Sequence, residues 1–294
     1  MKLITFKKSS NEENYRLGAL VSDTEVVDLT ALASDKNLTA SDLLKCFDLE
    51  NDFLEKAKTA LADENLPKIN RGEIELCAPV PRPPKIICIG LNYRDHAEES
   101  GMAIPASPII FSKFSSCAIG AGSPILLPGA SEQVDYEAEL AFIVGRRAKN
   151  VKKEDALEYV LGYTNFNDVS ARDFQFADGQ WQRGKSCDTF APMGEFIATR
   201  DEIRDPDNLR IQFRLNGQTL QDSNTRELIF KIPALIEFLS ASITLEVGDV
   251  IATGTPPGVG FARKPPVFMR AGDVAEVEIQ GLGILSNLVE RDEE

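Results

Sequence analysis

Apolar and polar residues alternate in short runs near the start of the chain, which is the pattern of strands with one buried face. Farther along, the spacing changes to that of helices, and Phe53, Ala57 and Leu61 share one apolar face. The predicted strands are residues 3–6, 15–21 and 25–29, and the predicted helices are residues 40–48 and 52–62. This pattern indicates a small N-terminal α+β domain.

A proline-rich stretch, CAPVPRPP at residues 77–84, follows this region. Because proline lacks an amide hydrogen and fixes φ, four prolines in six residues favour an extended connector. We therefore expect two domains, a small one over residues 1–78 and a larger catalytic one over residues 79–294.

The larger region contains more predicted strands than helices, and the two do not alternate regularly. The pair Asn216-Gly217 is the clearest hairpin turn in the chain. Because regular alternation is typical of doubly wound sheets, the pattern favours a mixed α/β, β-rich fold. The predicted strands are residues 86–89, 109–111, 137–144, 161–165, 196–199, 274–279 and 283–287, and the predicted helices are residues 92–100, capped by Asn92, and residues 232–240.

Charge and composition narrow the function. The chain has 294 residues with 46 acidic and 32 basic side chains, a formal charge of −14, which argues against a nucleic-acid binder because phosphates require a basic face. No apolar run approaches the roughly 18 residues that span a bilayer, and the start lacks a signal-peptide pattern, so we expect a cytoplasmic protein without a membrane partner. The five cysteines form no CxxC pair, and the single histidine, His96, excludes sites that need two imidazoles.

Acidic residues mark a candidate metal site. Glu137 and Glu139 in VDYEAEL point to one face of a predicted buried strand, where their charges repel and lose hydration. From this spacing alone, a metal site and a pair of glutamates that bind arginines or reach solvent remain equally open. Asp168 would complete an all-oxygen site for Mg²⁺, Mn²⁺ or Ca²⁺ if it converges on them, and otherwise it caps the next turn.

Three other segments carry candidate catalytic side chains. On a helix, His96 and Glu99 are three residues apart, so the glutamate could orient the imidazole for water activation; the alternative is a histidine that faces solvent. Lys185 could neutralise a substrate anion, or it could be an exposed lysine. Gly254 and Thr255 could offer a backbone donor and a hydroxyl to a carboxylate, or they could belong to an ordinary loop.

Five motifs occur in an order that resembles the fumarylacetoacetate hydrolase (FAH) family: IGLNYRDHAEE, VDYEAEL, NDVSARDFQ, GKSCDTFAPMG and TGTPPGVG. The resemblance covers about residues 84–289, and the N-terminal region resembles the family's N-terminal domain. Two further segments, PIIFSKF and RKPPVFMRAGD, are most similar to its FAH domain-containing protein 2 branch. The resemblance implies a β-sandwich or roll like the family's C-terminal domain, a homodimer, and Mg²⁺ or Mn²⁺ as the cofactor.

The resemblance also implies roles for individual residues. The matching positions are Glu137, Glu139 and Asp168 for the metal ligands, His96 and Glu99 for the water-activating pair, Lys185 for the catalytic lysine, and Arg172, Gln175 and Thr255 for the substrate pocket.

Two positions depart from the family pattern. Leu91 stands where relatives that act as acylpyruvases often carry arginine, and this removes a contact for a substrate carboxylate. Glu195 follows Gly194 where proline is usual, and we expect this change to affect packing more than chemistry.

The expected substrate is a small 2-oxo acid, which can chelate a divalent ion through its carboxylate and 2-oxo group. Cleavage of the adjacent C3–C4 bond then leaves a stabilised enolate. The expected reaction is acylpyruvate hydrolysis, with water activated by His96, or oxaloacetate decarboxylation, which needs no attacking water. Two alternatives remain open: a hydratase or isomerase acting on a 2-oxo-alkenoate of aromatic catabolism, and a non-catalytic, metal-stabilised scaffold.

Overall fold

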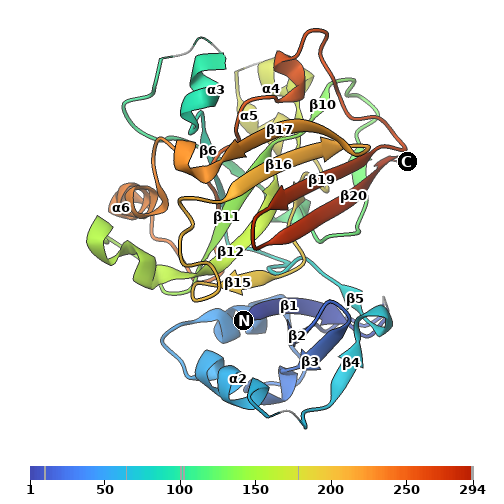
Figure 1. The fold of residues 1–294 in the computed structure, drawn as a ribbon, viewed down its shortest axis with the longest axis vertical. Helices are drawn as coiled ribbons and strands as arrows, with labels where there is room; N and C mark the ends of the chain where they lie inside the picture. Colours follow the sequence, from blue (N-terminus) through green and yellow to red (C-terminus); the bar gives the residue numbers. More distant parts are fainter. Residues whose placement is uncertain (10, 64, 100, 102, 178, 293–294) are drawn as a thin grey trace.

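The protein is described by a computed structural model that covers residues 1–9, 11–63, 65–99, 101, 103–177 and 179–292. Figure 1 shows the N-terminal elements, in blue, beneath a larger β-rich part that holds the C-terminus. Within the described ranges, no helix is long and apolar enough to cross a membrane.

The N-terminal elements form as the hydrophobic pattern predicts. The middle positions of β1 and β2 are all buried, so both faces of these strands are covered, and α1 begins with a capping box in which Thr39 and Asp42 satisfy each other's backbone amides. The elements are β1 (Lys2–Lys7), β2 (Arg16–Leu20), β3 (Glu25–Asp28), α1 (Ala40–Phe47), α2 (Phe53–Leu61), β4 (Lys68–Asn70) and β5 (Glu75–Leu76).

The large sheet continues from these strands into the rest of the chain. β1 pairs antiparallel with β15, with Leu3 opposite Ile197. The strand order is β4-β3-β2-β1-β15-β12-β11-β18-β6-β7, and β5 pairs with β1. The added strands are β6 (Ile86–Gly90), β7 (Ile109–Lys113), β11 (Ala138–Val144), β12 (Val160–Asn167), β15 (Ile197–Thr199) and β18 (Val250–Ala252). The division of the chain at residues 78 and 79 stays a prediction.

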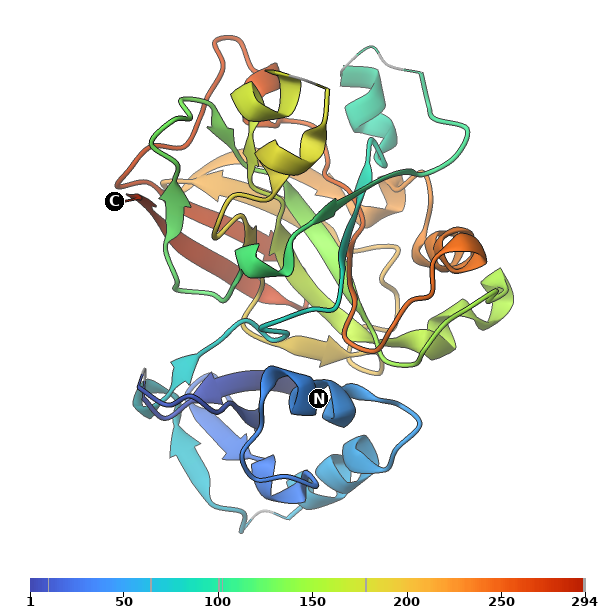
Figure 2. The ribbon, with the colours of Figure 1, turned by 180° about the vertical axis from the view of Figure 1, so that it is seen from behind.

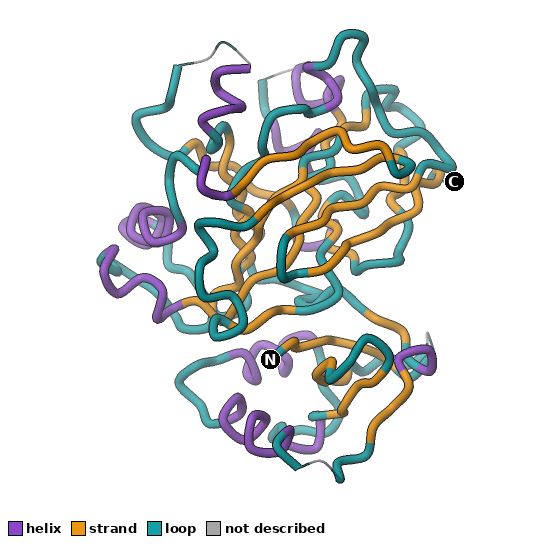
Figure 3. The backbone as a smooth tube through the Cα atoms, in the orientation of Figure 1, coloured by secondary structure: helices purple, strands orange, loops and turns teal. Residues whose placement is uncertain are grey.

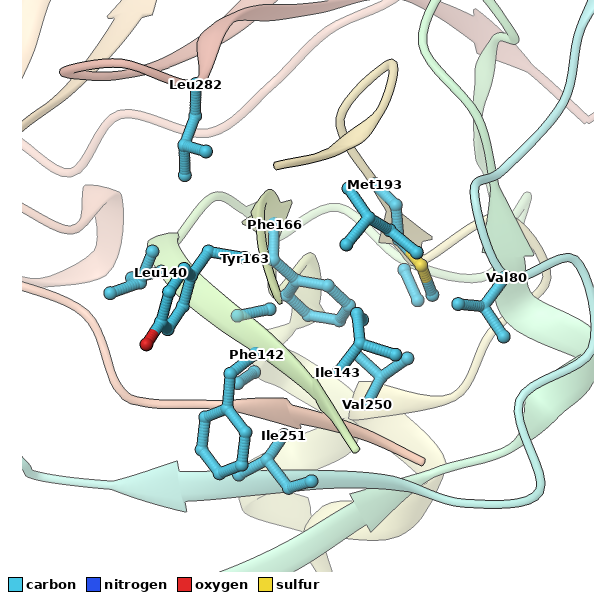
Figure 4. Packing of buried hydrophobic residues seen from close by; sticks show 14 of the residues in the cluster. Val80, Leu140, Phe142, Ile143, Tyr163, Phe166, Met193, Val250, Ile251 and Leu282 are labelled. Atoms are coloured by element: carbon cyan, nitrogen blue, oxygen red, sulfur yellow. The ribbon is translucent and has the colours of Figure 1, made fainter. Parts of the chain in front are cut away.

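A second sheet packs on the first and encloses the core. β11 and β12 contact β16 and β19 across the interface, and Tyr136 stacks on Phe213 with ring centroids 3.9 Å apart. Figure 4 shows core residues such as Phe142, Phe166 and Val250 gathered from adjacent strands. The sheet has the order β17-β16-β19-β20-β9, with β9 (Ile125–Leu127), β16 (Arg210–Leu215), β17 (Gln218–Asn224), β19 (Val274–Ile279) and β20 (Gly283–Arg291). The predicted mixed α/β, β-rich fold is confirmed.

Short helices lie around the strands, as Figure 3 shows, and three of them gather at the end of the larger part that is remote from the N-terminal elements (Figures 1 and 2). The described residues also form two short strand pairs, β10 with β13 and β8 with β14. These elements are α3 (Arg94–Glu99), α4 (Arg172–Ala177), α5 (Trp181–Lys185), β8 (Ala118–Ile119), β10 (Val134–Asp135), β13 (Ser170–Ala171) and β14 (Ala191–Pro192), and α6 (Ile232–Ser242) lies to one side.

Two local predictions have different outcomes. The hairpin at Asn216-Gly217 is present, with φ of 52° and 77° at the two turn residues. The prediction that Asn92 caps the next helix is wrong: α3 begins at Arg94, and the buried amide of Asn92 donates instead to the carbonyls of Thr253 and Phe230, at 2.7 and 3.0 Å. Ser100, where that helix is expected to end, lies outside the described residues.

Candidate active site

The structure brings the three predicted metal ligands together. Each of Glu137, Glu139 and Asp168 is buried and offers a carboxylate oxygen, and these oxygens all lie within 4.8 Å of one another. Glu139 belongs to β11, Glu137 directly precedes that strand, and Asp168 directly follows β12. Since β11 and β12 pair with Ala138 opposite Asn167, the strand register places the acids side by side.

Three buried cations pair with two of these acids. The ammonium of Lys185 lies 2.9 Å from Glu137 Oε2 and 2.8 Å from Asp168 Oδ2. Lys113 donates to the other oxygen of Asp168 and, at 2.9 Å, to the carbonyl of Val169. Arg172 Nη2 donates to Glu137 Oε1 at 2.6 Å. Lys185 is therefore buried in the site and not exposed, so its position is consistent with the predicted catalytic role.

The acids differ sharply in electrostatic environment. Burial works to raise the pKa of Glu137, but Lys185 and Arg172 lower it to about 2. For Glu139, burial raises the pKa well above its ordinary value, and the negative charges of Asp168 and Glu137 raise it further. The backbone N–H of Gly254 donates a hydrogen bond to Glu139 Oε2 at 2.7 Å.

This arrangement fits a divalent cation. Glu139 is a buried carboxylate whose charge no salt bridge among the described residues compensates, and a nearby cation would relieve its repulsion from Asp168 and Glu137. The donor set contains only oxygen, which suits Mg²⁺, Mn²⁺ or Ca²⁺ better than zinc or copper. Glu137, Glu139 and Asp168 are thus the residues that could hold the ion.

His96 and Glu99 form the predicted pair on α3. His96 Nδ1 lies 3.5 Å from Glu99 Oε2, and the imidazole side chain is 12% exposed. Glu99 also accepts a hydrogen bond from the backbone N–H of Gly258, at 3.1 Å. At this distance His96 Nδ1 makes no hydrogen bond among the described residues, so Glu99 lies beside the ring without fixing it here, and the catalytic role of the pair stays a prediction.

The loop over residues 253–260 contacts the acid triad through Gly254 and contacts Glu99 through Gly258. Gly254 has a φ of 105°, a backbone conformation that favours glycine, and its N–H points at Glu139. Thr255 donates its hydroxyl to the carbonyl of Ala138 at 3.0 Å and accepts from Gln221 at 2.9 Å. In this structure Gly254 and Thr255 both hydrogen-bond to β11, the strand that carries Glu139. Their substrate-binding roles stay predictions.

Arg172 and Gln175 lie in the same buried network. The guanidinium nitrogens of Arg172 donate to Asp135, Gln175 and Glu137, at 2.9, 2.8 and 2.6 Å. Both side chains are 3% exposed. In this structure Arg172 therefore contacts Glu137, and Gln175 contacts Arg172. Direct contact of either side chain with a substrate remains a prediction.

Sequence reasoning missed Lys113 and Asp135, both of which belong to this network. Lys113 is the last residue of β7, in the segment PIIFSKF, and it is buried. A lysine within a largely apolar strand was the sequence signal that could have identified it. Asp135 lies two residues before Glu137 in VDYEAEL and is fully buried. Neither position has a spacing that identifies its partner before the fold is known.

The two departures from the family pattern have structural counterparts. Leu91 has a φ of 50°, in the left-handed region, at the turn between β6 and α3. Glu195 forms an ion pair with Arg71, so it joins the segment before β15 to the N-terminal part. Glu195 thus contacts a distant segment, and the expectation that this change affects packing more than chemistry stays a prediction.

Comparisons with known proteins agree with this geometry. The chain is 47% identical over 292 residues to the oxaloacetate tautomerase fahd2, mitochondrial, of Xenopus laevis, covering 98% of this chain and 90% of that protein. It is 44% identical to the fumarylacetoacetate hydrolase domain-containing protein 2 homolog of Dictyostelium discoideum, covering 98% and 97%. These two names agree with the predicted branch of the family.

Solved structures match over the full length. The maleylpyruvate hydrolase of Sphingobium sp. SYK-6, determined in complex with manganese(II) and pyruvate, superimposes with a TM-score of 0.83 at 31% identity and covers 100% of both chains. The fumarylacetoacetate hydrolase of Exiguobacterium antarcticum gives a TM-score of 0.83 at 35% identity, covering 99% of this chain and 100% of the other. The model of the fumarylacetoacetate (FAA) hydrolase C-terminal domain matches residues 85–290, and the chain belongs to the fumarylacetoacetate hydrolase family.

Proposed function

We propose that this protein is a divalent-metal-dependent enzyme that acts on a 2-oxo acid through an enolate, and that keto–enol tautomerisation of oxaloacetate is its principal reaction. One observation carries the proposal: a single loop contacts the acid triad through Gly254 and the His96–Glu99 pair through Gly258. An acid–base pair held beside a buried cation site is what proton transfer next to a carbonyl requires. Relatives named oxaloacetate tautomerases, 47–48% identical, support this choice over the C3–C4 cleavage reactions.

A bound Mg²⁺ or Mn²⁺ would supply the charge that stabilises an enolate oxygen. His96, oriented by Glu99, takes a proton from C3 as the C2=C3 double bond forms, and the imidazolium then passes that proton to the 2-oxo oxygen, which returns His96 to its neutral form. Lys185, whose pKa burial lowers but Asp168 and Glu137 raise more strongly, remains an ammonium that can donate to that oxygen. The buried surroundings keep competing water away from these groups.

Hydrolysis of an acylpyruvate is the second candidate, because the 3.5 Å contact between His96 and Glu99 also suits activation of a water molecule. One of the similar solved structures is named a maleylpyruvate hydrolase, which is a hydrolase of this kind. Oxaloacetate decarboxylation uses the same enolate, and so do hydratases and isomerases acting on 2-oxo-alkenoates. These reactions differ in product, which an assay can separate.

The test is a panel of substrates with protein that has been treated with a chelator and then reloaded with Mg²⁺ or Mn²⁺. The decay of enol-oxaloacetate is followed by its ultraviolet absorbance, while CO₂ release reports decarboxylation and pyruvate release from an acylpyruvate reports hydrolysis. We expect metal-dependent enol decay to be the fastest. Metal binding without turnover of any substrate would support the scaffold instead.

We also propose a homodimer located in the cytoplasm. β7 is the last strand of the large sheet, and exposed Ile109, Ile110 and Phe114 lie on it or beside it, which is unusual for an edge strand facing water. A two-fold pair is the commonest way to cover such a surface. Light scattering at micromolar concentration should give twice the chain mass of 32.3 kDa, and a monomeric mass would contradict the proposal.

The relatives' names place those proteins in mitochondria, so fractionation of the native cells would test the proposed cytoplasmic location.

A further inference from the structure

Asp135 is a fully buried carboxylate that lies on β10, two residues before Glu137. Its Oδ1 accepts the backbone N–H groups of Tyr136 and Gly260, at 2.8 and 2.7 Å. Its Oδ2 accepts the N–H of Phe261 at 3.0 Å and Nε of Arg172 at 2.9 Å. Four donors from three segments therefore fix both oxygens of this side chain.

Arg172 connects Asp135 to a candidate metal ligand. Its Nε binds Asp135, and its Nη2 binds Glu137 Oε1 at 2.6 Å. The ring of Phe261 covers the guanidinium, whose carbon lies 4.5 Å from the ring centroid. Burial works to lower the pKa of Arg172, but Glu137 and Asp135 raise it above its ordinary value, so the cation is permanent.

The contacts of Asp135 also leave little room for rearrangement. A Cβ atom at Gly260 would lie 2.5 Å from Asp135 Oδ1, so the loop packs directly on the carboxylate. The same loop reaches Glu139 through Gly254. Asp135 is thus oriented by three backbone N–H groups, and it in turn orients the guanidinium of Arg172.

We infer that Asp135 is a positioning residue of the metal centre, which holds Arg172 on Oε1 of Glu137, so that Oε2, which Lys185 also contacts at 2.9 Å, and part of the negative charge remain for the ion. The inference rests on the proposed metal site. Without the charge of Asp135, the full charge of the guanidinium acts on Glu137, and the buried network gains one net positive charge. Both effects oppose a divalent cation, so metal affinity falls even though every ligand remains.

The test compares Mn²⁺ affinity, measured by calorimetry and by the electron paramagnetic resonance signal of free Mn²⁺, in the full chain and in Asp135→Asn. Residues that hold metal ligands in place typically contribute 10- to 100-fold to affinity, so we expect a loss of about that size. The matched control is Asp249→Asn. Asp249 is equally buried and accepts from Lys85 at 2.7 Å and from the N–H of Glu246 at 2.7 Å, but it contacts none of the metal ligands. Its replacement should leave affinity within about twofold.

A double-mutant cycle separates positioning from general damage. If Asp135 acts through Arg172, then Asp135→Asn should change the affinity much less in an Arg172→Gln background than in the wild type. Equal changes in the two backgrounds, or unchanged affinity in Asp135→Asn, would overturn the inference. Should Asp135→Asn not fold, Arg172→Lys keeps one positive charge but cannot contact Asp135 and Glu137 together, so it should lower the affinity at least tenfold, and unchanged affinity would overturn the inference. A wild type that binds no Mn²⁺ would refute the proposed metal centre itself, and the inference with it.

Discussion

Replacing Glu139 with glutamine should stabilise the metal-free protein while it removes metal binding. Glu139 is 1% exposed, its charge has no salt-bridge partner among the described residues, and Asp168 and Glu137 add repulsion to the effect of burial. Glutamine has the same shape, and its oxygen can still accept the N–H of Gly254. The substitution therefore removes an unfavourable charge and leaves the packing intact.

The magnitude follows from the desolvation of a charged group. Leaving a buried polar group poorly satisfied costs about 1–3 kcal/mol, so Glu139→Gln should raise the stability of the metal-free protein by about that amount at high pH. At about 2–4 °C per kcal/mol for chains of this order of size, Tm should rise by several degrees. In contrast, a ligand at 100 times its Kd adds about 2.7 kcal/mol to the wild type, and the variant should lose this gain.

The pH dependence of the folding stability predicts the sign of the Glu139→Gln effect independently. The pKa of Glu139 is higher in the folded chain than its ordinary value of 4.5, so the folded protein binds that proton more tightly than the unfolded chain does. The corresponding stability is complete below pH 4.5 and is lost as the pH rises through the folded pKa. The advantage of Glu139→Gln should therefore grow above pH 4.5. Since the pKa of Glu137 is lowered to about 2, the opposite contribution of that group changes only below its ordinary value of 4.5.

The assay is thermal unfolding from pH 5 to pH 9, with a chelator and with saturating Mn²⁺. Glu137→Gln is the matched control, because it removes the shared partner of Lys185 and Arg172 and should destabilise the metal-free protein by about 3–5 kcal/mol. The reasoning fails if Glu139→Gln destabilises the metal-free protein, or if Mn²⁺ raises its Tm as much as that of the wild type.

Three further predictions test other parts of the site. His96→Asn should slow acylpyruvate hydrolysis by about 10²–10⁴-fold and oxaloacetate decarboxylation much less; equal losses would show that the histidine does more than activate water. Gly254→Ala, at a φ of 105° and with its Cβ 2.8 Å from a neighbouring side-chain carbon, should reduce the Mn²⁺-dependent rise in Tm. Gly272→Ala, at a φ of 93° with open space around it, should preserve that rise. Arg71→Ala and Glu195→Ala, measured singly and together by urea unfolding, should show a coupling of about 0–1 kcal/mol, because the pair is partly exposed; a coupling above about 2 kcal/mol would contradict this.

Local patterns were sufficient to predict much of the fold. The hairpin at Asn216-Gly217 and the period-2 alternation of residues 274–279 depend on neighbouring residues, so they can be read from the sequence. The convergence of Asp168 on Glu137 came from the family motifs. Strand spacing alone left that contact open, since it depends on which strands pair.

Contacts between distant segments could not be predicted in this way. Asn92 has the composition of a helix cap, but the carbonyl of Thr253, 161 residues away, competes successfully for its amide. Lys113 binds Asp168 across 55 residues, and β1 joins β15 from the opposite side of the predicted connector. Each of these partners is defined by the tertiary fold, and no local spacing encodes it.

The charge balance of the site explains why so many buried ionisable groups are retained. Four buried carboxylates, those of Asp135, Glu137, Glu139 and Asp168, face three buried cations, so the fully ionised network carries one net negative charge. A divalent ion would reverse this to one net positive charge, which the single carboxylate of a 2-oxo acid head group then balances. A hydrophobic replacement of the whole network would be expected to give a more stable chain, as it does for other buried ion pairs. Under the proposed function, the network would hold a cation and then an anion, which explains its retention better than a contribution to stability does.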